Sequence, residues 1–310
     1  MKTDYSKLLT EAAHPRAAHL EERSLEEIVE LLITEEAKAH RAALACRREI
    51  ARAAELVVAA LSSGGRLIYA GAGTSGRLGA LDAAELPPTF GSSRAQVIAL
   101  LAGGPRAMLR SIEGAEDRGG SAAVKLARLG VGERDVVCAI AASGVTAFAR
   151  AALKTARERG ARTVFVTCVK SPEHAALADV VIAATVGPEV LAGSTRLKAG
   201  TATKIVLNAL STASMVKLGK VYRGRMVDVV ATNQKLRDRA RRIVAELTGA
   251  DARTVRALLA QAGGRAKLAL AIHALGVAPA EAARRLDAAG GDLHRLLDGK
   301  LPLSKKRRRR

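Results

Sequence analysis

A short apolar segment runs straight into a turn of glycines and hydroxyl residues at two places in this sequence. The first is residues 66–78, RLIYAGAGTSGRL, and the second is residues 136–146, VVCAIAASGVT. Each pattern is typical of a buried strand, a tight turn and the start of a helix, since glycine tolerates the backbone angles of such turns. Helix N-termini bind anions through free N–H groups, and hydroxyls donate to anion oxygens. Two such turns in one sheet therefore favour a protein that holds a phosphorylated small molecule.

Strand-like and helix-like segments alternate through the middle of the chain. Five short segments rich in Val, Ile or Leu are separated by helix-length segments; they are residues 66–71, 95–102, 135–142, 162–168 and 179–186. This alternation predicts an α/β fold in which a parallel sheet is covered by helices on both faces. Ligands of such sheets bind beyond the carboxyl ends of the strands, which is where both turns lie.

Helical patterns flank this middle part. Ser24 and Glu27 form a capping box, and a longer helical pattern runs through Ala43 and Ile50 to a glycine pair at 64–65. A long helix is expected over about residues 196–218. Four short helices are expected over residues 235–248, 252–262, 264–275 and 279–288, separated by glycines. We expect four parts: an N-terminal helical segment (1–50), a central domain (51–235), a C-terminal helical domain (236–300) and a basic tail (301–310).

The net charge of the chain is +20 at neutral pH, and the tail Lys305–Arg310 carries six of these charges, which leaves +14 on the body. Runs of like charge repel one another, so we interpret the tail as solvated. Only 2% of the residues are aromatic and none is Trp, so surfaces for stacking nucleic-acid bases are scarce. Nucleic acid is thus an unfavoured partner, whereas positive charge attracts an anionic substrate.

The sequence also bears on location and on metals. No apolar run reaches the roughly 20 residues of a membrane helix, and Met1–Tyr5 lacks the apolar core of a signal peptide. We therefore expect a cytoplasmic protein without a membrane partner. Cys46, Cys138 and Cys168 are odd in number and widely spaced, which favours reduced, buried thiols. The six histidines show no metal-ligand spacing.

The first turn consists of Gly73, Thr74, Ser75 and Gly76. Residues 71–76 match the G-x-G-x-x-G dinucleotide pattern, but no acidic residue follows in 91–102 to hold a ribose, and the Lys of a P-loop is absent. The two hydroxyls favour a compact phosphate. The second turn offers Ser143, Gly144 and Thr146 for the same purpose. The alternative is that these residues only form tight turns.

Two acidic clusters lie near these turns. Glu85 precedes Pro87-Pro88, which should end the helix and leave Glu85 at its carboxyl end. The helix dipole and partial burial would there raise the pKa of Glu85, as suits a general acid. Glu113 and Glu116 are three residues apart and are expected on one helical face, with one of them a base. The alternative for each cluster is a solvated charge.

A third group of residues, 187–201, opens the long helix. Ser194 or Thr195 is expected to cap it, with Arg196 and Lys198 in its first turn. Cations at that end oppose the helix dipole, which indicates a compensating anion. That anion is either the substrate or the nearby Glu189.

Taken together, these segments resemble the N-acetylmuramic acid 6-phosphate etherases of the SIS (sugar isomerase) superfamily. The stretches that carry the resemblance are GRLIYAGAGTSGRLGALDAAELPPTFG (65–91), IEGAED (112–117), IAASGVT (140–146) and residues 186–240. The resemblance extends from about Thr10 to Asp298. It implies an SIS-type five-stranded αβα sandwich with a small UBA-like helical domain after it.

The resemblance also implies an activity. These enzymes cleave the D-lactyl ether of N-acetylmuramic acid 6-phosphate by eliminating lactate and then adding water, in cell-wall amino-sugar recycling. They act as homodimers and need neither a metal nor an organic cofactor. Glu85 matches the acid that protonates the departing lactate oxygen, and Glu116, not Glu113, matches the base.

The binding residues carry over more loosely. Ser75, Ser143 and Thr146 fall at the sugar-phosphate hydroxyls of the superfamily, and Arg196 and Lys198 resemble contacts to the substrate anion. Val145 departs from the family, because many relatives have Arg there, and one possible anion contact is lost.

Two other functions remain open from the residues. One is a non-catalytic SIS sugar-phosphate sensor, and the other is an SIS aldose–ketose isomerase. The presence of both Glu85 and Glu116 favours an enzyme, and the LPPTFG and GSTRLKAGT segments argue against the isomerase.

Overall fold

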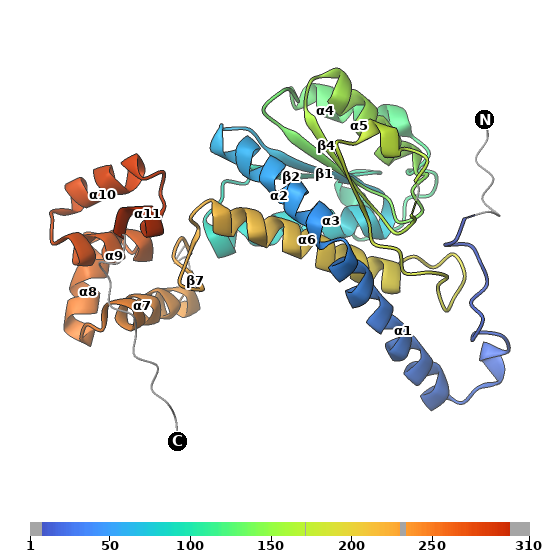
Figure 1. Cartoon of the computed structure of the whole chain (residues 1–310), viewed down its shortest axis with the longest axis horizontal. Coiled ribbons are helices and arrows are strands. Elements are labelled where there is room, and N and C mark those ends of the chain that lie inside the picture. The colour runs from blue at the N-terminus through green and yellow to red at the C-terminus, as the bar shows by residue number, and fades with distance from the viewer. Residues whose placement is uncertain (1–7, 171, 230–233, 298–310) are drawn as a thin grey trace. The chain divides into compact units, whose positions relative to one another are not determined.

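The computed structural model describes residues 8–170, 172–229 and 234–297, and it contains a five-stranded parallel sheet (Figure 1). The strands are β1 (Leu67–Gly71), β2 (Val97–Leu101), β3 (Val136–Ile140), β4 (Arg162–Thr167) and β5 (Val180–Ala183). Each falls within one of the five predicted segments, so the predicted α/β fold is confirmed.

The strand order is β2-β1-β3-β4-β5, and every pair is parallel. β1 and β3 are therefore neighbours although β2 lies between them in the sequence. Their register pairs Gly71 with Ile140, the last residues of the two strands. The two Gly/Ser turns consequently leave the same edge of the sheet side by side.

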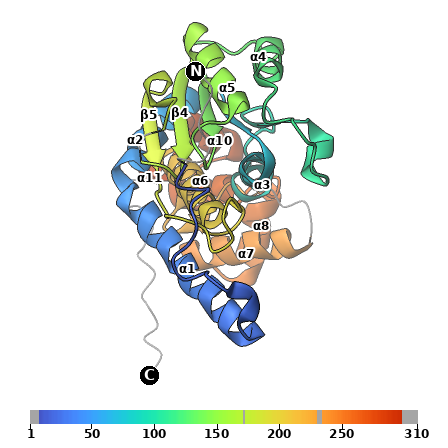
Figure 2. The same ribbon diagram turned by 90° about the vertical axis from the view of Figure 1, so that its right-hand side faces the viewer.

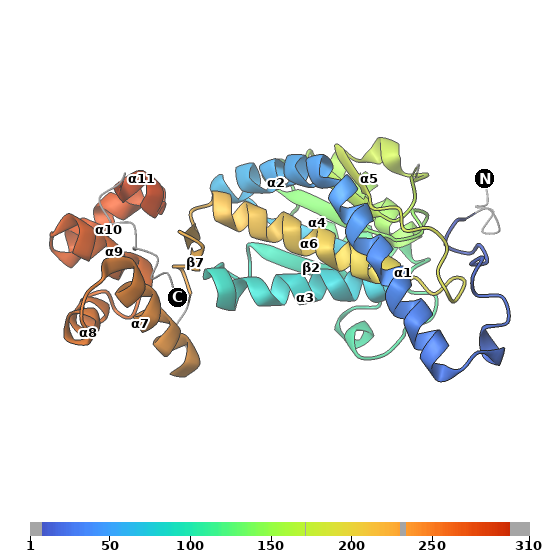
Figure 3. The ribbon, with the colours of Figure 1, turned by 60° about the horizontal axis from the view of Figure 1, so that its bottom comes forward.

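Helices cover both faces of the sheet (Figures 1 and 3). The helices α4 (Gly119–Arg128) and α5 (Ala147–Glu158) lie on one face, where Ile68 and Ala70 pack with Phe148. The helices α2 (Arg47–Ser62), α3 (Gly73–Phe90) and α6 (Lys198–Lys217) lie on the other. Alternate residues of β1 thus face opposite layers, as the pleat requires.

Glycines bring α3 very close to β1. A Cβ at Gly76 would lie 2.4 Å from the Gly71 carbonyl oxygen, and one at Gly79 would lie 2.9 Å from Tyr69 Cβ. Farther along α3, Tyr69 Oη donates to Asp82 Oδ2 over 2.8 Å. Asn208 and Ser211 of α6 donate to the other oxygen of Asp82, so one buried carboxylate joins β1, α3 and α6.

The N-terminal helix begins as predicted. Ser24 caps α1 (Leu25–Ala45), and the reciprocal hydrogen bonds of a capping box join it to Glu27. A continuous helix through Ala43 and Ile50 was wrong, because the chain breaks at Cys46 between α1 and α2. Gly64, at φ 77°, follows the end of α2 as expected.

The prolines of α3 do not end the helix. Pro87 and Pro88 lie inside it, and the helix continues to Phe90. Leu86 and Phe90 are buried, and the Gly91 N–H donates to the Pro87 carbonyl over 2.9 Å. Burial of these apolar side chains offsets the two helical hydrogen bonds that proline nitrogens cannot make. The expected position of Glu85 at the carboxyl end of this helix is therefore wrong.

The described residues form two compact units. Residues 8–84 and 94–213 form the first, which includes the sheet together with α1 and α2. Residues 85–93, 214–229 and 234–297 form the second. The four-part division expected from the sequence stays a prediction, and the basic tail lies outside the described residues.

The second unit contains the predicted short helices. They are α7 (Gln234–Thr248), α8 (Ala252–Gln261), α9 (Ala266–Leu275) and α10 (Pro279–Ala288), followed by α11 (Leu293–Leu297). The sequence patterns did not predict a small hairpin of β6 (Val221–Tyr222) and β7 (Arg225–Met226), which turns at Arg223 and Gly224 with positive φ. Among the described residues, no single helix is long and apolar enough to cross a membrane.

The three cysteines are free and buried, as interpreted from the sequence. Burial raises the pKa of Cys168 to about 12 and also raises that of Cys138. Thiols of this kind are poor nucleophiles.

Candidate active site

A hollow of about 280 Å³ opens beyond the carboxyl ends of β1 and β2. Its lining brings the first turn together with the second acidic cluster, and it consists of Ala72, Gly73, Arg77, Ala102, Ala107, Ser111, Ile112, Glu113, Gly114, Ala115 and Glu116. This is the edge at which parallel sheets hold their ligands.

The first turn presents the N-terminus of α3 to this hollow. The Gly76 N–H donates to the Ala72 carbonyl over 3.1 Å, which is where the helical hydrogen bonds begin. The N–H groups of Gly73, Thr74 and Ser75 therefore precede the ladder, and the positive end of the helix dipole lies among them. Gly73 has φ 51°, a conformation that favours glycine.

Glu116 lies in a turn, not on a helix. Gly114 has φ 64°, which breaks the helix expected across Glu113 and Glu116, and α4 begins only at Gly119. The Phe148 N–H donates to the Glu116 carbonyl over 2.9 Å. The side chains of both glutamates are exposed at the hollow.

The same hydrogen bond brings the second turn to this region, because Phe148 lies in the first turn of α5. Ser143 and Thr146 are half-buried between β3 and α5. Gly144 has φ 79°, and a Cβ there would lie 2.6 Å from Val169 Cγ2. Glycine is therefore required at this position.

The start of α6 also adjoins the first turn. A Cβ at Gly200 would lie 3.5 Å from Thr74 Cγ2, an ordinary contact distance. Glu189 Oε1 accepts a hydrogen bond from the Ala199 N–H over 2.9 Å. Glu189 thus caps α6 in place of Ser194 or Thr195, and the protein itself supplies an anion at this helix end.

Lys198 does not point into the hollow. Its Nζ lies 2.7 Å from Glu35 Oε2, and the Lys198 side chain is only 1% exposed. Lys198 thus forms a buried ion pair with α1, and its contact with the substrate stays a prediction. Arg196, by contrast, is exposed.

Two further bases approach the same Glu35 oxygen. Lys38 Nζ lies 2.7 Å from it and His14 Nε2 lies 3.0 Å from it. The Arg16 N–H donates to His14 Nδ1, so Nε2 carries the proton that points at Glu35. Burial alone would raise the pKa of Glu35, but hydrogen bonds from Lys198, Lys38 and His14 outweigh it and lower the pKa to about 2.

Comparison with known proteins gives a consistent result. The chain is 49% identical over 290 residues to an N-acetylmuramic acid 6-phosphate etherase of Mycolicibacterium smegmatis, which covers 94% of this chain and 97% of the relative. It is 47% identical over 291 residues to the etherase of Synechocystis, covering 94% and 95% of the two chains. The chain belongs to the N-acetylmuramic acid 6-phosphate etherase family.

Two family models and several solved structures match shorter parts of the chain. Residues 121–213 match the SIS domain, and residues 49–157 match the N-terminal SIS domain of glucokinase regulatory protein. Among solved structures, phosphoheptose isomerase from Neisseria gonorrhoeae is similar, with a TM-score of 0.48 and 19% identity. That match covers 62% of this chain and 98% of the isomerase.

The proposed acid of the etherase family, Glu85, is not among the residues that line the hollow. It is exposed, so the partial burial expected from the sequence is absent in this chain. It lies on the part of α3 that belongs to the second unit. The helix runs without a break from Gly73 past Glu85 to Phe90.

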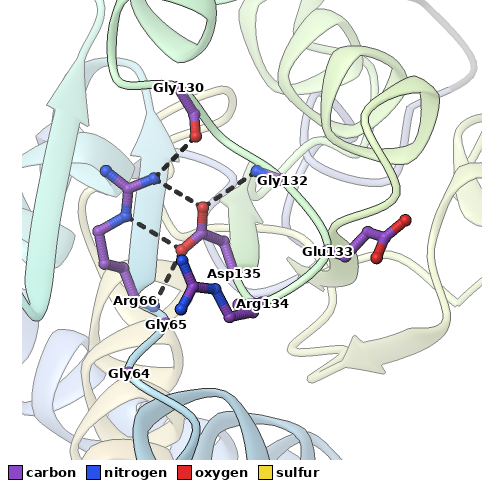
Figure 4. A pocket seen from close by; sticks show the side chains of 8 residues that line it. All are labelled: Gly64, Gly65, Arg66, Gly130, Gly132, Glu133, Arg134 and Asp135. Atoms are coloured by element: carbon purple, nitrogen blue, oxygen red, sulfur yellow. Dashed lines mark hydrogen bonds and ion pairs between the residues drawn. The ribbon is translucent and has the colours of Figure 1, made fainter.

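A larger hollow, of about 570 Å³, lies at the opposite ends of β1 and β3 (Figure 4). The charged side chains at its centre are hydrogen-bonded to each other. Arg66 donates to both oxygens of Asp135 and to the carbonyls of Leu129 and Gly130. We interpret this hollow as a structural feature, since its central charges, Arg66 and Asp135, are paired with each other.

Two residues of the site region were missed at the sequence level. Arg77 lines the hollow, and its place four residues after Gly73 was the available signal. Glu35 had no signal of its own, because a charged residue on a charged helix is expected to be solvated.

Proposed function

We propose that this chain cleaves the D-lactyl ether of N-acetylmuramic acid 6-phosphate, giving N-acetylglucosamine 6-phosphate and D-lactate. One observation carries the proposal: the hollow joins the open N-terminus of α3 with Glu116, in a chain that is 49% identical to an etherase over nearly its whole length. A helix N-terminus suits a phosphate, and a carboxylate suits the removal of a carbon-bound proton.

The phosphate is held between the two turns. Gly73, Thr74, Ser75 and Gly76 offer backbone N–H groups and hydroxyls from the first turn. Ser143, Gly144 and Thr146 offer the same from the second turn. Ser194 and Arg196 approach from the loop before α6. Lys198, which is paired with Glu35, follows Arg196 at the start of α6 and supports this loop.

The reaction begins on the open-chain aldehyde. Glu116 removes the proton at C2, which the neighbouring carbonyl makes acidic, and an enolate forms. The C3–O bond then breaks and the electron pair leaves with the lactate oxygen, which Glu85 protonates. Water adds at C3 of the unsaturated aldehyde, and a proton returns to C2. No metal or organic cofactor takes part, and the reaction takes place in the cytoplasm.

The site is shared between two copies of the chain. Ser75 and Glu85 are ten positions apart on one continuous helix, which separates them by roughly 15 Å. A single sugar phosphate is too short to bridge such a distance. We therefore assign Glu85 to the hollow of a second copy, in a homodimer.

The deciding experiment measures D-lactate. Purified protein with N-acetylmuramic acid 6-phosphate and a chelator should release D-lactate and N-acetylglucosamine 6-phosphate in equal amounts. Formation of a ketose phosphate would point instead to an isomerase. Binding of the sugar phosphate with no chemical change would point to a sensor.

Isotope exchange separates the two glutamates. In deuterated water, we expect Glu116→Gln to lose both deuterium exchange at C2 and lactate release. Glu85→Gln should retain C2 exchange but lose lactate release, because only the departure of lactate needs its proton. Glu113→Gln is the matched control and should retain both. The reverse pattern for Glu85 and Glu116 would exchange their roles.

A further inference from the structure

Arg77 spans the gap between the first turn and the segment that carries Glu116. It lies in the first turns of α3 and lines the hollow. Its Nε donates to the carbonyls of Ala107 and Met108 over 3.0 and 3.2 Å. Its Nη2 donates to the Arg110 carbonyl over 3.4 Å. One guanidinium thus holds three carbonyls of a single loop.

That loop, residues 102–118, has few other contacts to hold it. It contains only one short 3-10 helix, Pro105–Met108, and it extends away from the sheet (Figure 2). Gly103 and Gly104 open it with positive φ, and Leu109 is 90% exposed. Only the small side chains of Ala102, Ala107 and Ala115 are buried in this loop, and loops that bury so little apolar surface have low local stability.

Backbone pairing and hydrogen bonds hold the loop at three places, and Ala115 packs in the hydrophobic core. β2 holds its start, Arg77 holds its middle, and the Phe148 N–H holds it at the Glu116 carbonyl. Of these, only Arg77 comes from the helix that we propose receives the phosphate. The distance between the phosphate turn and Glu116 therefore depends on the Arg77 side chain.

We infer that Arg77 is a positioning residue, which sets Glu116 at the correct distance from the bound phosphate. This inference rests on the proposed function. A charged donor strengthens hydrogen bonds to carbonyls, and the planar fork reaches several carbonyls at once. Lysine has a single ammonium and cannot reproduce this fork. Without Arg77, the groups for the chemistry remain but their geometry loosens.

The first experiment compares Arg77→Met with the wild-type enzyme. We expect kcat to fall about 100-fold with KM changed less than about threefold, because small misplacement of a catalytic group has effects of this size. Deuterium exchange at C2 should fall by the same factor, since Glu116 acts before lactate leaves. Guanidinium ion should restore part of the activity of Arg77→Met. Arg128→Met, an exposed arginine on α4, is the control and should behave as wild type.

A second readout does not depend on activity. Amide hydrogen exchange over residues 103–116 should be faster in Arg77→Met, while exchange in β1 and β3 stays unchanged. Amide exchange of the loop in Arg77→Lys should be faster than in wild type and slower than in Arg77→Met. Arg77→Lys serves as the test if Arg77→Met does not fold. This readout keeps its meaning even when the wild-type chain releases no lactate, which would overturn only the proposed function.

Other outcomes would overturn the inference. Unchanged amide exchange in the loop together with kcat within twofold of wild type would show that Arg77 holds nothing of consequence. A rise in KM with unchanged kcat would show that Arg77 binds the substrate directly. Faster exchange throughout the sheet in both variants would show a general structural role.

Discussion

At the scale of single residues, Asp135 is a buried carboxylate whose two oxygens both accept hydrogen bonds. It accepts from the Arg66 backbone N–H, from Arg66 Nε and Nη2, and from the Gly132 N–H (Figure 4). Burial alone would raise the pKa of Asp135, but the hydrogen bonds and charge of Arg66 outweigh it and lower the pKa. The pair joins the start of β1 to the start of β3.

Asp135→Asn should destabilise the chain by about 3 kcal/mol, because it leaves a partly buried guanidinium without its counter-charge. The pKa of Asp135 is lower in the folded than in the unfolded chain. Its stabilisation is therefore full above the unfolded pKa of about 4 and is lost as the pH falls through the folded pKa. Urea unfolding at several pH values should show the difference between wild type and variant shrinking below about pH 4.

The exposed Glu133, two residues before Asp135 in the loop between α4 and β3, provides the control. Glu133→Gln should leave the unfolding free energy within about 0.5 kcal/mol of wild type. An equal loss in both variants would mean that the loop, and not the ion pair, is responsible.

At the scale of elements, the strands were predictable and the ends of the helices were not. Each strand is an unbroken apolar run, and a parallel sheet buried on both faces requires that composition. Pro87 and Pro88 predicted a helix end because the local rule ignores the burial of Leu86 and Phe90. The three-residue spacing of Glu113 and Glu116 failed because Gly114 takes a positive φ between them.

In the candidate site, too, some features could be predicted from the sequence and others could not. The two turns were predictable, since glycines and hydroxyls after a strand have few other uses. The partners of Lys198 were not, because Glu35 and Lys198 are far apart in the sequence and pair only in the folded chain. The roles of Glu85 and Glu116 came from family resemblance, and the structure adds only the hollow in which Glu116 lies.

Gly76 provides a test of the close approach of α3 to β1. A methyl group there would meet the Gly71 carbonyl oxygen and Leu101 Cδ1, each at 2.4 Å. Gly76→Ala should therefore cost about 2–3 kcal/mol of stability, as overpacking does. Thermal unfolding followed by circular dichroism measures it.

Gly120 is the matched glycine. It lies in the first turn of α4, and a Cβ there would have nothing within 4 Å. Gly120→Ala should be neutral or stabilise the chain by up to about 1 kcal/mol. If both variants lose the same stability, helix propensity and not close packing controls these positions.

At the scale of the whole molecule, α1 carries an exposed apolar row. Leu25, Val29 and Ile33 are spaced by four residues and are 82%, 51% and 68% exposed. Rows of this kind on a helix are usually covered by another surface. We expect a second copy of the chain to cover this row, because the proposed function places Glu85 of one copy in the hollow of the other.

Ile33→Asp should convert a dimer into a monomer, because a charge in an apolar interface is left without solvation. Sedimentation velocity measures the mass, and lactate release should fall with it since Glu85 would no longer reach a second hollow. Thr34→Asp, on another side of α1, should stay dimeric and active. A fully active monomer would show that one chain holds a complete site.

The cluster at Glu35 has a consequence for how this chain tolerates mutation. One carboxylate oxygen serves His14 from the N-terminal segment, Lys38 from α1 and Lys198 from α6. Lys38 is 42% exposed and can turn to solvent when its partner is lost, whereas the buried Lys198 cannot. Neutral substitutions should therefore be mild at Lys38 and severe at Glu35. Because loss of either charge leaves the other buried and unpaired, a neutral residue at Lys198 or Glu35 should be tolerated only when the other position also becomes neutral.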